Sequence, residues 1–337
     1  MIDGIFNMID RARPWGHLAD APLEAEDYRV SSRDGVELHL RRVPPRGSSP
    51  GRPTLLFHGL GANHRAFHFP GRSLAEWLAG RGHDVWLPEL RGHGRSSFDG
   101  YDWRIDDYLE HDIPAILDFV LERTDAGAVN WVGHSMGGVL LLSFGILDSE
   151  DRIGRGVTVG SALDYRVGKT GFRGLLALRP LLSKFVALPY GTLVHLLAPA
   201  MGRGPGLLEA FNVWPENIED DVVRRIHAQC FHTIPVSLLE SLATTFEETG
   251  LRLDSGFEFL EHAPRLDFPV RLVAGSRDEQ VDIPAVERTA ELIGDNASVA
   301  LYGRPYGQPE DYGHFDLLLG RRAPDETWPD IAAFLEK

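Results

Sequence analysis

Short apolar runs alternate with amphipathic segments along most of the chain, and this alternation predicts the fold class. The runs have the length of strands, and the apolar positions between them recur every three or four residues, as in helices. Strands that alternate with helices form right-handed crossovers and a mostly parallel sheet. We therefore predict an α/β fold, a mostly parallel sheet flanked by helices. The expected strands cover residues 28–32, 36–43, 54–58, 84–90, 128–134, 156–162, 269–275 and 297–302.

The first two strands form a predicted hairpin, because apolar and polar residues alternate on both sides of Asp34-Gly35. The longest amphipathic helix is expected within residues 103–123. The other helices of the sheet layers are expected over residues 73–81, 137–147, 284–293 and 328–335.

The alternation stops between residues 163 and 266, and this interruption predicts an inserted domain. The segment is rich in leucine and proline and has helical periods over residues 175–186, 220–231 and 236–247, without a convincing strand. Such an insertion is either a cap over a site or a separate domain, and its helical character favours a cap. We expect a core of residues 1–162 and 267–337, with a helical cap (lid) of residues 163–266 after the sixth strand.

Composition and charge exclude several classes of protein. The chain has 337 residues, 43% of them hydrophobic and 25% charged, which fits one large globular domain with an insertion. A net charge of −15 argues against nucleic acid or an anionic membrane as the partner, because both would be repelled. The single cysteine, Cys230, excludes an intrachain disulfide framework, and we expect a buried or semi-buried thiol there.

Neither a secretory signal nor a transmembrane segment is predicted. Residues 1–13 have no basic stretch followed by an apolar core. No uninterrupted apolar run reaches the roughly 18 residues that a spanning helix needs. We therefore expect a cytoplasmic location.

The sharpest chemical motif is G-H-S-M-G at residues 133–137, which fits G-x-S-x-G. A predicted strand precedes it and a predicted helix follows it, as a nucleophile elbow requires. The glycines admit a tight turn on which the hydroxyl of Ser135 is exposed above the sheet. The alternative is a chance glycine-rich turn, and the strand–turn–helix context favours the elbow.

Two backbone N–H groups are candidates for stabilising an oxyanion. The N–H of Met136 follows Ser135, and that of Leu60 lies in H-G-L-G at residues 58–61, just after an earlier strand. Because both groups belong to the backbone, the side chains at these positions are free to vary. We expect His58 to brace this loop rather than to react.

An attacking serine needs a general base, and the base needs an acidic group to orient it. On this kind of sheet the order is serine, then acid, then histidine. Asp278 follows the strand at 269–275 and His314 lies after the last strand, so both fit. The remaining histidines precede the serine or lie within the expected cap. The rival acids are Glu279, Asp282 and Asp164.

Two further patterns suggest other chemistry, and both are incomplete. Gly168-Lys169-Thr170 resembles the end of a phosphate-binding loop, but position 163 is Leu163 where the first glycine is needed. His64 and His68 have the spacing of metal ligands on a helix, without a nearby acidic or cysteine partner in the sequence. No metal and no cofactor are therefore expected.

Several segments together resemble one known family. They are D-G-V-E-L-H-L-R-R-V at 34–43, H-G-L-G-A-N at 58–63, H-D-V-W-L-P-E-L-R-G-H-G-R-S at 83–96, G-H-S-M-G-G at 133–138 and Y-G-H-F-D-L-L-L-G at 312–320. They are similar to the α/β-hydrolases of the lipase and esterase type, and in particular to the acid-lipase-like branch. The resemblance implies a catalytic triad of Ser135, Asp278 and His314 and carboxylic ester substrates, often lipid-like. Asp316 in the H-F-D segment is expected to brace the histidine loop.

These observations lead to the hypothesis of a serine hydrolase that cleaves carboxylic esters with an apolar acyl or alcohol group through an acyl-enzyme. His134, Phe185 and Leu182 are the candidate substrate-binding residues. The leucines of 175–186 either line the acyl pocket or only pack the cap onto the core. The alternatives are an acyltransferase or thioesterase with the same triad, and a ligand-binding homologue without activity.

Overall fold

A computed structural model describes residues 23–47, 51–148, 150–177, 179–202 and 206–337. Residues 1–13, which are predicted to form no secretory signal, lie outside these ranges, and so does Leu178 of the predicted cap. The side chains of Leu175 and Leu176 are also outside the described part of the chain.

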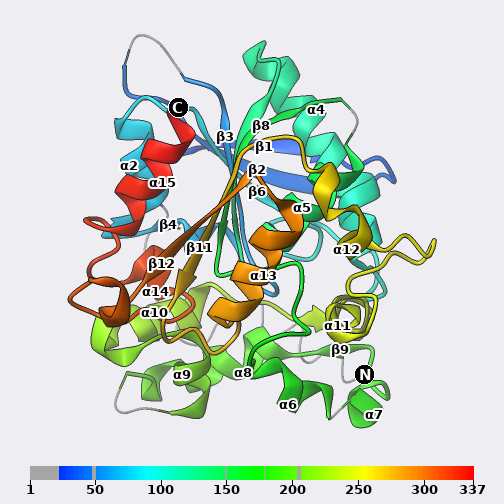
Figure 1. The fold of residues 1–337 in the computed structure, drawn as a ribbon, viewed down its shortest axis with the longest axis vertical. Helices are drawn as coiled ribbons and strands as arrows, with labels where there is room; N and C mark the ends of the chain where they lie inside the picture. The colour runs from blue at the N-terminus through cyan, green and yellow to red at the C-terminus, as the bar shows by residue number, and fades with distance from the viewer. Residues whose placement is uncertain (1–22, 48–50, 149, 178, 203–205) are drawn as a thin grey trace.

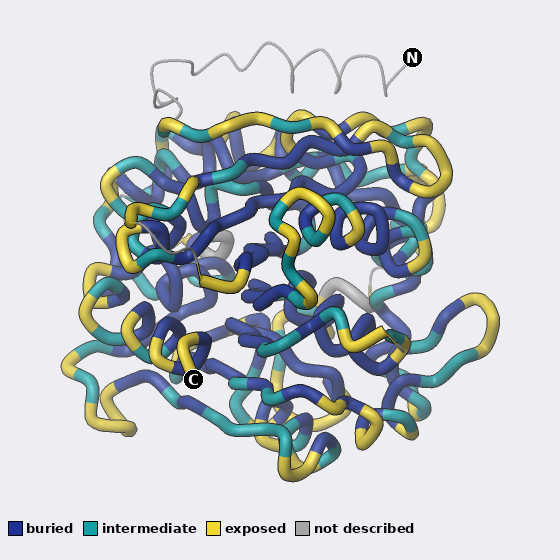
Figure 2. The backbone as a smooth tube through the Cα atoms, turned by 90° about the horizontal axis from the view of Figure 1, so that it is seen from above, coloured by how far each residue is buried: buried dark blue, intermediate teal, exposed yellow. Residues whose placement is uncertain are grey.

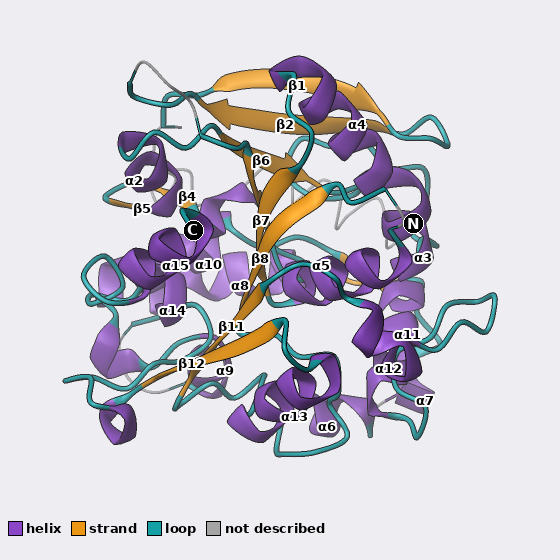
Figure 3. Cartoon of the chain, turned by 45° about the horizontal axis from the view of Figure 1, so that its top comes forward, coloured by secondary structure: helices purple, strands orange, loops and turns teal. Residues whose placement is uncertain are grey.

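An eight-stranded sheet with the order β1–β2–β6–β3–β7–β8–β11–β12 runs through the molecule, with helices on both sides (Figures 1 and 3). The strands from β6 to β12 pair in parallel, and β2 is antiparallel to both of its neighbours. The predicted α/β class and the hairpin are therefore confirmed. The strands are β1 (Glu26–Ser31), β2 (Glu37–Val43), β3 (Thr54–Phe57), β6 (Val85–Glu89), β7 (Val129–His134), β8 (Ile153–Val159), β11 (Val270–Gly275) and β12 (Ala297–Tyr302).

Strand β8 begins at Ile153, earlier than the expected residue 156. The polar residue Arg155 interrupts the apolar run at this point, so the sequence pattern does not reveal the first three residues of the strand. In the structure the Arg155 guanidinium lies over the Phe334 ring, 5.4 Å from its centroid, which accommodates the cation at the start of the strand.

The central strands are buried on both faces because each face packs against a helical layer. Along β3, Leu55 and Phe57 join one hydrophobic core and Leu56 joins the other. The buried interior is visible in Figure 2, where exposed residues gather at the periphery. Helices α4 (Ile113–Thr124), α5 (Met136–Leu147) and α13 (Ile283–Ile293) cover one face, and α2 (Leu74–Gly80) and α15 (Thr327–Leu335) cover the other.

Short elements complete the core between the main strands and helices. A two-residue hairpin of β4 (His68–Phe69) and β5 (Arg72–Ser73) follows the turn η2 (His64–Ala66). Ahead of α4 lie α3 (Ile105–Asp107) and η3 (Tyr108–Asp112). The turn η8 (Arg304–Tyr306) and helix α14 (Asp316–Leu319) connect β12 to α15.

The segment between β8 and β11 is mainly helical, as expected, but its helices are short. One pair of two-residue strands, β9 (Ala187–Leu188) and β10 (Ile234–Pro235), was not expected from the sequence. The described helices and turns are α6 (Phe172–Leu176), α7 (Arg179–Leu182), α8 (Tyr190–Leu197), η4 (Ala198–Ala200), α9 (Leu207–Asn212), η5 (Pro215–Asn217), α10 (Asp220–Gln229), α11 (Val236–Ala243), η6 (Thr244–Phe246), α12 (Phe259–His262) and η7 (Ala263–Arg265).

In Figure 1 the elements α6 to α11 lie together below the sheet, on the side opposite the C-terminus of the chain. We refer to residues 163–266 as the cap, and its boundaries remain a prediction. Within the described part of the chain, no helix combines the length and the apolar character that are needed to cross a bilayer.

Candidate active site

The turn between β7 and α5 holds Ser135 in a strained backbone conformation. Its φ is 54° and its ψ is −121°, a region that residues with a side chain rarely adopt. Two flanking glycines allow the strand and the helix to approach each other. A Cβ on Gly133 would lie 2.1 Å from the Gly137 oxygen, and a Cβ on Gly137 would lie 2.2 Å from the Phe57 oxygen. The turn therefore has the geometry of a nucleophile elbow.

His314 and Asp278 form a buried pair at the ends of two loops. His314 Nδ1 lies 2.8 Å from Asp278 Oδ2. The other oxygen of Asp278 accepts hydrogen bonds from the backbone N–H groups of Gln280 (2.8 Å) and Val281 (3.0 Å). These donors fix the carboxylate, and the carboxylate fixes the imidazole. His314 Nε2 is buried and has no hydrogen-bond partner among the described residues, so this nitrogen is left to accept a proton.

Strand β8 and the loop after it bring Ser135 and His314 to one region of the sheet. The Ser135 N–H donates to the oxygen of Val159 at 2.9 Å. A Cβ on the next residue, Gly160, would lie 3.0 Å from His314 Nδ1. The neighbouring His134 contacts the histidine loop as well, since its Nε2 lies 3.2 Å from the His314 oxygen.

The Ser135 hydroxyl and His314 Nε2 are not hydrogen-bonded in this structure, because Nε2 has no partner. Bonds of this kind are often long in unliganded sites and tighten around a substrate.

The two expected oxyanion donors belong to residues that line the same pocket as Ser135. Leu60 and Met136 both border this pocket. Helix α5 begins at Met136, and the first N–H groups of a helix have no acceptor within it. His58 lies behind the loop, where its Nε2 accepts from the Leu90 N–H at 3.2 Å. Burial lowers the pKa of His58 to about 4, so the ring is neutral and braces the loop.

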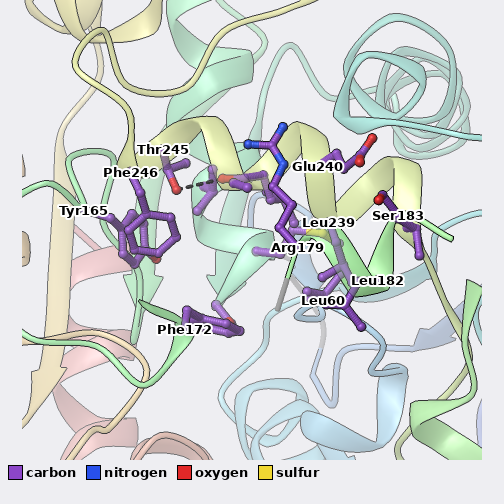
Figure 4. Close-up of a pocket in the computed structure, with 16 residues that line it drawn as sticks. Leu60, Tyr165, Phe172, Arg179, Leu182, Ser183, Leu239, Glu240, Thr245 and Phe246 are labelled. Atoms are coloured by element: carbon purple, nitrogen blue, oxygen red, sulfur yellow. Dashed lines mark hydrogen bonds between the residues drawn. The ribbon is translucent and has the colours of Figure 1, made fainter. Parts of the chain in front are cut away.

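A largely apolar pocket, partly open to solvent, lies between the core and the cap above Ser135 (Figure 4). Tyr165 and Phe246 pack against each other on one wall, with ring centroids 5.5 Å apart. The pocket is lined by Leu60, Ser135, Met136, Val139, Tyr165, Phe172, Arg179, Leu182, Ser183, Val236, Leu239, Glu240, Leu242, Ala243, Thr245 and Phe246.

Of the three expected substrate-binding residues, only Leu182 lines this pocket. Phe185 is 53% exposed and is not among the lining residues. His134 is fully buried below the turn, where its ring packs edge-on against Phe67 and tilted against Phe315. Burial lowers the pKa of His134 well below its usual value. The structure therefore does not bring Phe185 and His134 to the pocket, and we do not retain a substrate-binding role for them.

Two of the rival acids, Asp164 and Asp282, have other partners, and the third, Glu279, is exposed. Asp164 is buried and pairs with Arg166 Nη2 at 2.7 Å. Asp282 precedes α13, and its Oδ2 accepts from the Lys169 N–H at 2.8 Å. The hydrogen bond of His314 Nδ1 goes to Asp278 instead.

Two side-chain clusters have the residue types of metal ligands. Asp34, Asp107 and His111 offer ligand atoms within 4.8 Å of one another. However, Arg91 Nη1 lies 2.7 Å from Asp34 and 3.6 Å from Asp107, so a guanidinium already neutralises these carboxylates.

The second cluster is the one around His64, where the sequence suggested no acidic partner. That expectation is wrong. His64 Nδ1 lies 2.6 Å from Glu89 Oε1, a residue 25 positions along the chain. His64 Nε2 faces Arg41 Nη1 at 3.0 Å, which leaves neither nitrogen open to a cation. The rings of His64 and His68 are 6.4 Å apart.

Comparisons with known proteins agree with this architecture. A family model described as "alpha/beta hydrolase fold" matches residues 53–190. Human lipase member K is 34% identical over 128 residues, which cover 33% of this chain and 32% of the relative. Human gastric triacylglycerol lipase is 33% identical over 128 residues, with the same shares. These matches therefore span about a third of the length of either lipase.

The solved structures extend the likeness to nearly the whole chain. An esterase from Exiguobacterium antarcticum superimposes with a TM-score of 0.63 at 14% identity, covering 93% of this chain and all of the esterase (100%). At this identity the likeness establishes the fold alone.

The comparisons also correct one expectation. A cytoplasmic location is wrong, because relatives such as gastric triacylglycerol lipase, by its name an enzyme of the stomach, point away from the cytoplasm. Taken with the sheet order and the elbow, the matches establish that this chain has the α/β-hydrolase fold and that about a third of it is similar to lipases.

Proposed function

We propose that the chain is a serine hydrolase that cleaves carboxylic esters through an acyl-enzyme. Ser135 is the nucleophile, His314 the general base and Asp278 the residue that orients His314. The backbone N–H groups of Leu60 and Met136 stabilise the oxyanion. The observation that carries the proposal is the buried Asp278–His314 pair. His314 Nε2 has no hydrogen-bond partner among the described residues, and His314 lies at the same edge of the sheet as Ser135 with its strained backbone.

The reaction has two steps. Ser135 Oγ attacks the acyl carbon while His314 Nε2 takes the hydroxyl proton, and the developing oxyanion accepts hydrogen bonds from the two N–H groups. His314 then donates this proton to the leaving alcohol, which departs and leaves the acyl group on Ser135. Water attacks next, its proton passes to His314, and the acid is released as Oγ regains a proton.

The pocket supports a substrate with an apolar acyl or alcohol group. Its walls are mostly aliphatic and aromatic, and they are supplied by both the core and the cap. Binding a hydrocarbon chain against such walls removes it from water, which contributes roughly 0.8 kcal/mol to the free energy of binding for each buried methylene. Relatives named triacylglycerol lipases act on esters of this type by name, which favours lipid-like esters here.

A labelling and turnover experiment tests this proposal. The wild-type protein should react with a fluorophosphonate probe at Ser135 and hydrolyse p-nitrophenyl esters, with higher kcat/KM for butyrate and longer acyl groups than for acetate. Ser135→Ala should lose labelling and roughly 10⁴-fold or more in kcat, because nucleophile and base act as a unit.

Ser143→Ala is the matched control. Ser143 is a buried serine of helix α5, and its hydroxyl has no hydrogen-bond partner among the described residues. It should retain labelling and turnover. Esterase activity that survives in Ser135→Ala would overturn the mechanism, and an absence of labelling in the wild type would indicate a protein that only binds its ligand. Acyl transfer to an added alcohol, or a preference for thioesters, would identify the transferase or thioesterase alternatives.

A further inference from the structure

One short segment of the cap is hydrogen-bonded to the loop that carries His314. Asp316 lies two residues after this histidine and is completely buried. Its Oδ2 accepts from the N–H of Gly313 at 2.7 Å and from the N–H of Trp214, a cap residue, at 2.6 Å. The N–H of Phe315 in turn donates to the oxygen of cap residue Asn212 at 2.9 Å. Of the two neighbours of His314, Gly313 is therefore linked to the cap through Asp316, and Phe315 is hydrogen-bonded to the cap directly.

The same cap segment also contacts the loop that carries Asp278. The amide of Gln280 donates from Nε2 to the oxygen of Phe211 at 3.0 Å and to Asn212 Oδ1 at 3.2 Å. The backbone N–H of this glutamine is one of the two donors to Asp278 Oδ1. Gln280 and Asn212 are both buried, so these bonds are shielded from water.

We propose that cap residues 211–214 form a clamp that holds the Asp278 and His314 loops in register, with Asp316 and Gln280 as positioning residues. This inference rests on the proposed function. The cap segment 211–214, Asp316 and Gln280 do not touch the reacting atoms, and they act through the geometry of the Asp278–His314 hydrogen bond. The cap thus contributes to the alignment of the catalytic groups as well as to the pocket wall.

The expected effect follows from the sensitivity of proton transfer to distance. A displacement of about 1 Å in a catalytic group can reduce turnover by about 100-fold. Removing the Asp316 acceptor leaves two N–H groups without this partner, that of buried Gly313 in the loop and that of half-buried Trp214 in the cap. The two segments then separate or admit water, and His314 moves with its loop.

A pair of substitutions at Asp316 separates the hydrogen bonds from the shape of the side chain. Burial raises the pKa of Asp316 to about 8, so the group is mainly neutral at pH 7 and asparagine is a close substitute for it. Asp316→Asn keeps a carbonyl oxygen toward the two N–H groups and should retain kcat within about twofold. Asp316→Leu has a similar shape without an acceptor, and its kcat per active site should fall by about 10-fold or more, with KM within about twofold.

Active sites are counted with the fluorophosphonate, so that loss of folded protein is not mistaken for slow turnover. Proton NMR adds a readout that is independent of substrate. The strongly downfield resonance of the proton shared by His314 and Asp278 should persist in Asp316→Asn and broaden or disappear in Asp316→Leu.

A second arm keeps the test valid if Asp316→Leu does not fold. Gln280→Met preserves the length of the side chain and removes both bonds to the cap segment, and it should also lower kcat per active site, by about 3-fold to 10-fold. Ser237→Ala is the matched control, since it removes a hydrogen bond of 2.8 Å between the cap and the oxygen of Trp103, away from both loops. It should leave kcat per active site unchanged.

The two proposals fail in different ways. If Ser135→Ala abolishes activity but Asp316→Leu and Gln280→Met keep the wild-type kcat per active site and the wild-type resonance, the clamp is refuted and the hydrolase stands. If activity survives in Ser135→Ala, the proposed function itself is refuted. A loss of kcat in Ser237→Ala equal to that in Gln280→Met would also overturn the clamp, because any contact between cap and core would then serve.

Discussion

Adding a methyl group at Gly160 perturbs the hydrogen bond between Asp278 and His314 directly. The φ of Gly160 is 58°, and a Cβ there would lie 3.0 Å from both Asp278 Oδ2 and His314 Nδ1, the two atoms that are joined by the 2.8 Å hydrogen bond. Ordinary contacts of a carbon atom begin near 3.5 Å, so both side chains must retreat by about 0.5 Å in Gly160→Ala. A displacement of about 1 Å reduces turnover by about 100-fold, so a displacement of about 0.5 Å should reduce it by about 10-fold.

The substitution also affects stability. Holding an alanine at positive φ costs about 1–2 kcal/mol. In a protein of this size each kcal/mol lowers the Tm by roughly 2–4 °C. We therefore expect kcat per titrated active site to fall by about 10-fold and the Tm to fall by roughly 2–8 °C. Turnover of a p-nitrophenyl ester and a thermal unfolding curve measure the two quantities separately.

Gly35→Ala provides the matched control for this prediction. Gly35 has a φ of 93° in the β1–β2 turn, and nothing lies within 4 Å of its would-be Cβ. It should reproduce the loss of stability without any loss of kcat. If Gly160→Ala kept the wild-type kcat while its Tm fell as far as that of Gly35→Ala, the link between the Asp278–His314 geometry and turnover would be refuted.

Two further predictions concern pH and the pocket. The pKa of Asp316 is about 8 in the folded protein, against a usual value of 3.8. Between about pH 4 and pH 8 the folded chain therefore keeps a proton on Asp316 that the unfolded chain has lost. Stability should therefore fall as the pH rises from about 4 to 8, by at most about 1.4 kcal/mol per pH unit from this group, and Asp316→Asn should remove that part of the slope in urea unfolding curves. Phe246→Ala should enlarge the pocket next to Tyr165. The ratio of kcat/KM for long over short p-nitrophenyl esters should then rise several-fold. An unchanged ratio would show that the acyl group lies elsewhere.

The centre of the sheet was predictable because its strands are buried on both faces. A strand such as β3, with Leu55, Leu56 and Phe57 directed to two cores, is apolar at every position, and this pattern is visible in the sequence alone. The start of β8 was missed because Arg155 is stabilised by a ring from the far end of the chain. A local pattern carries no information about such a partner.

The proximity of His314 to Asp278 was anticipated from the chain order of this fold, but their surroundings were not. His134 is fully buried below the elbow, where Phe67 and Phe315 surround its ring. Phe185 is more than half exposed although its residue type suggests a pocket wall. The contacts of residues 211–214 with both loops depend on segments about 70 to 100 positions away, and no spacing rule connects them.

Helix α5 is buried from Met136 to Ile146, so the turn that carries the serine is attached to a helix with almost no contact with water. Openings of low free energy start where buried apolar contacts are few, and the cap surface, with Leu181, Phe185 and Val186 more than half exposed, is such a place. A protease or a mild denaturant should therefore attack the cap long before it reaches the elbow. Ser135 would then stay folded after the cap has opened, but the proposed clamp on the Asp278 and His314 loops would be lost with the cap, so the rate of acylation and the preference among esters should both fall.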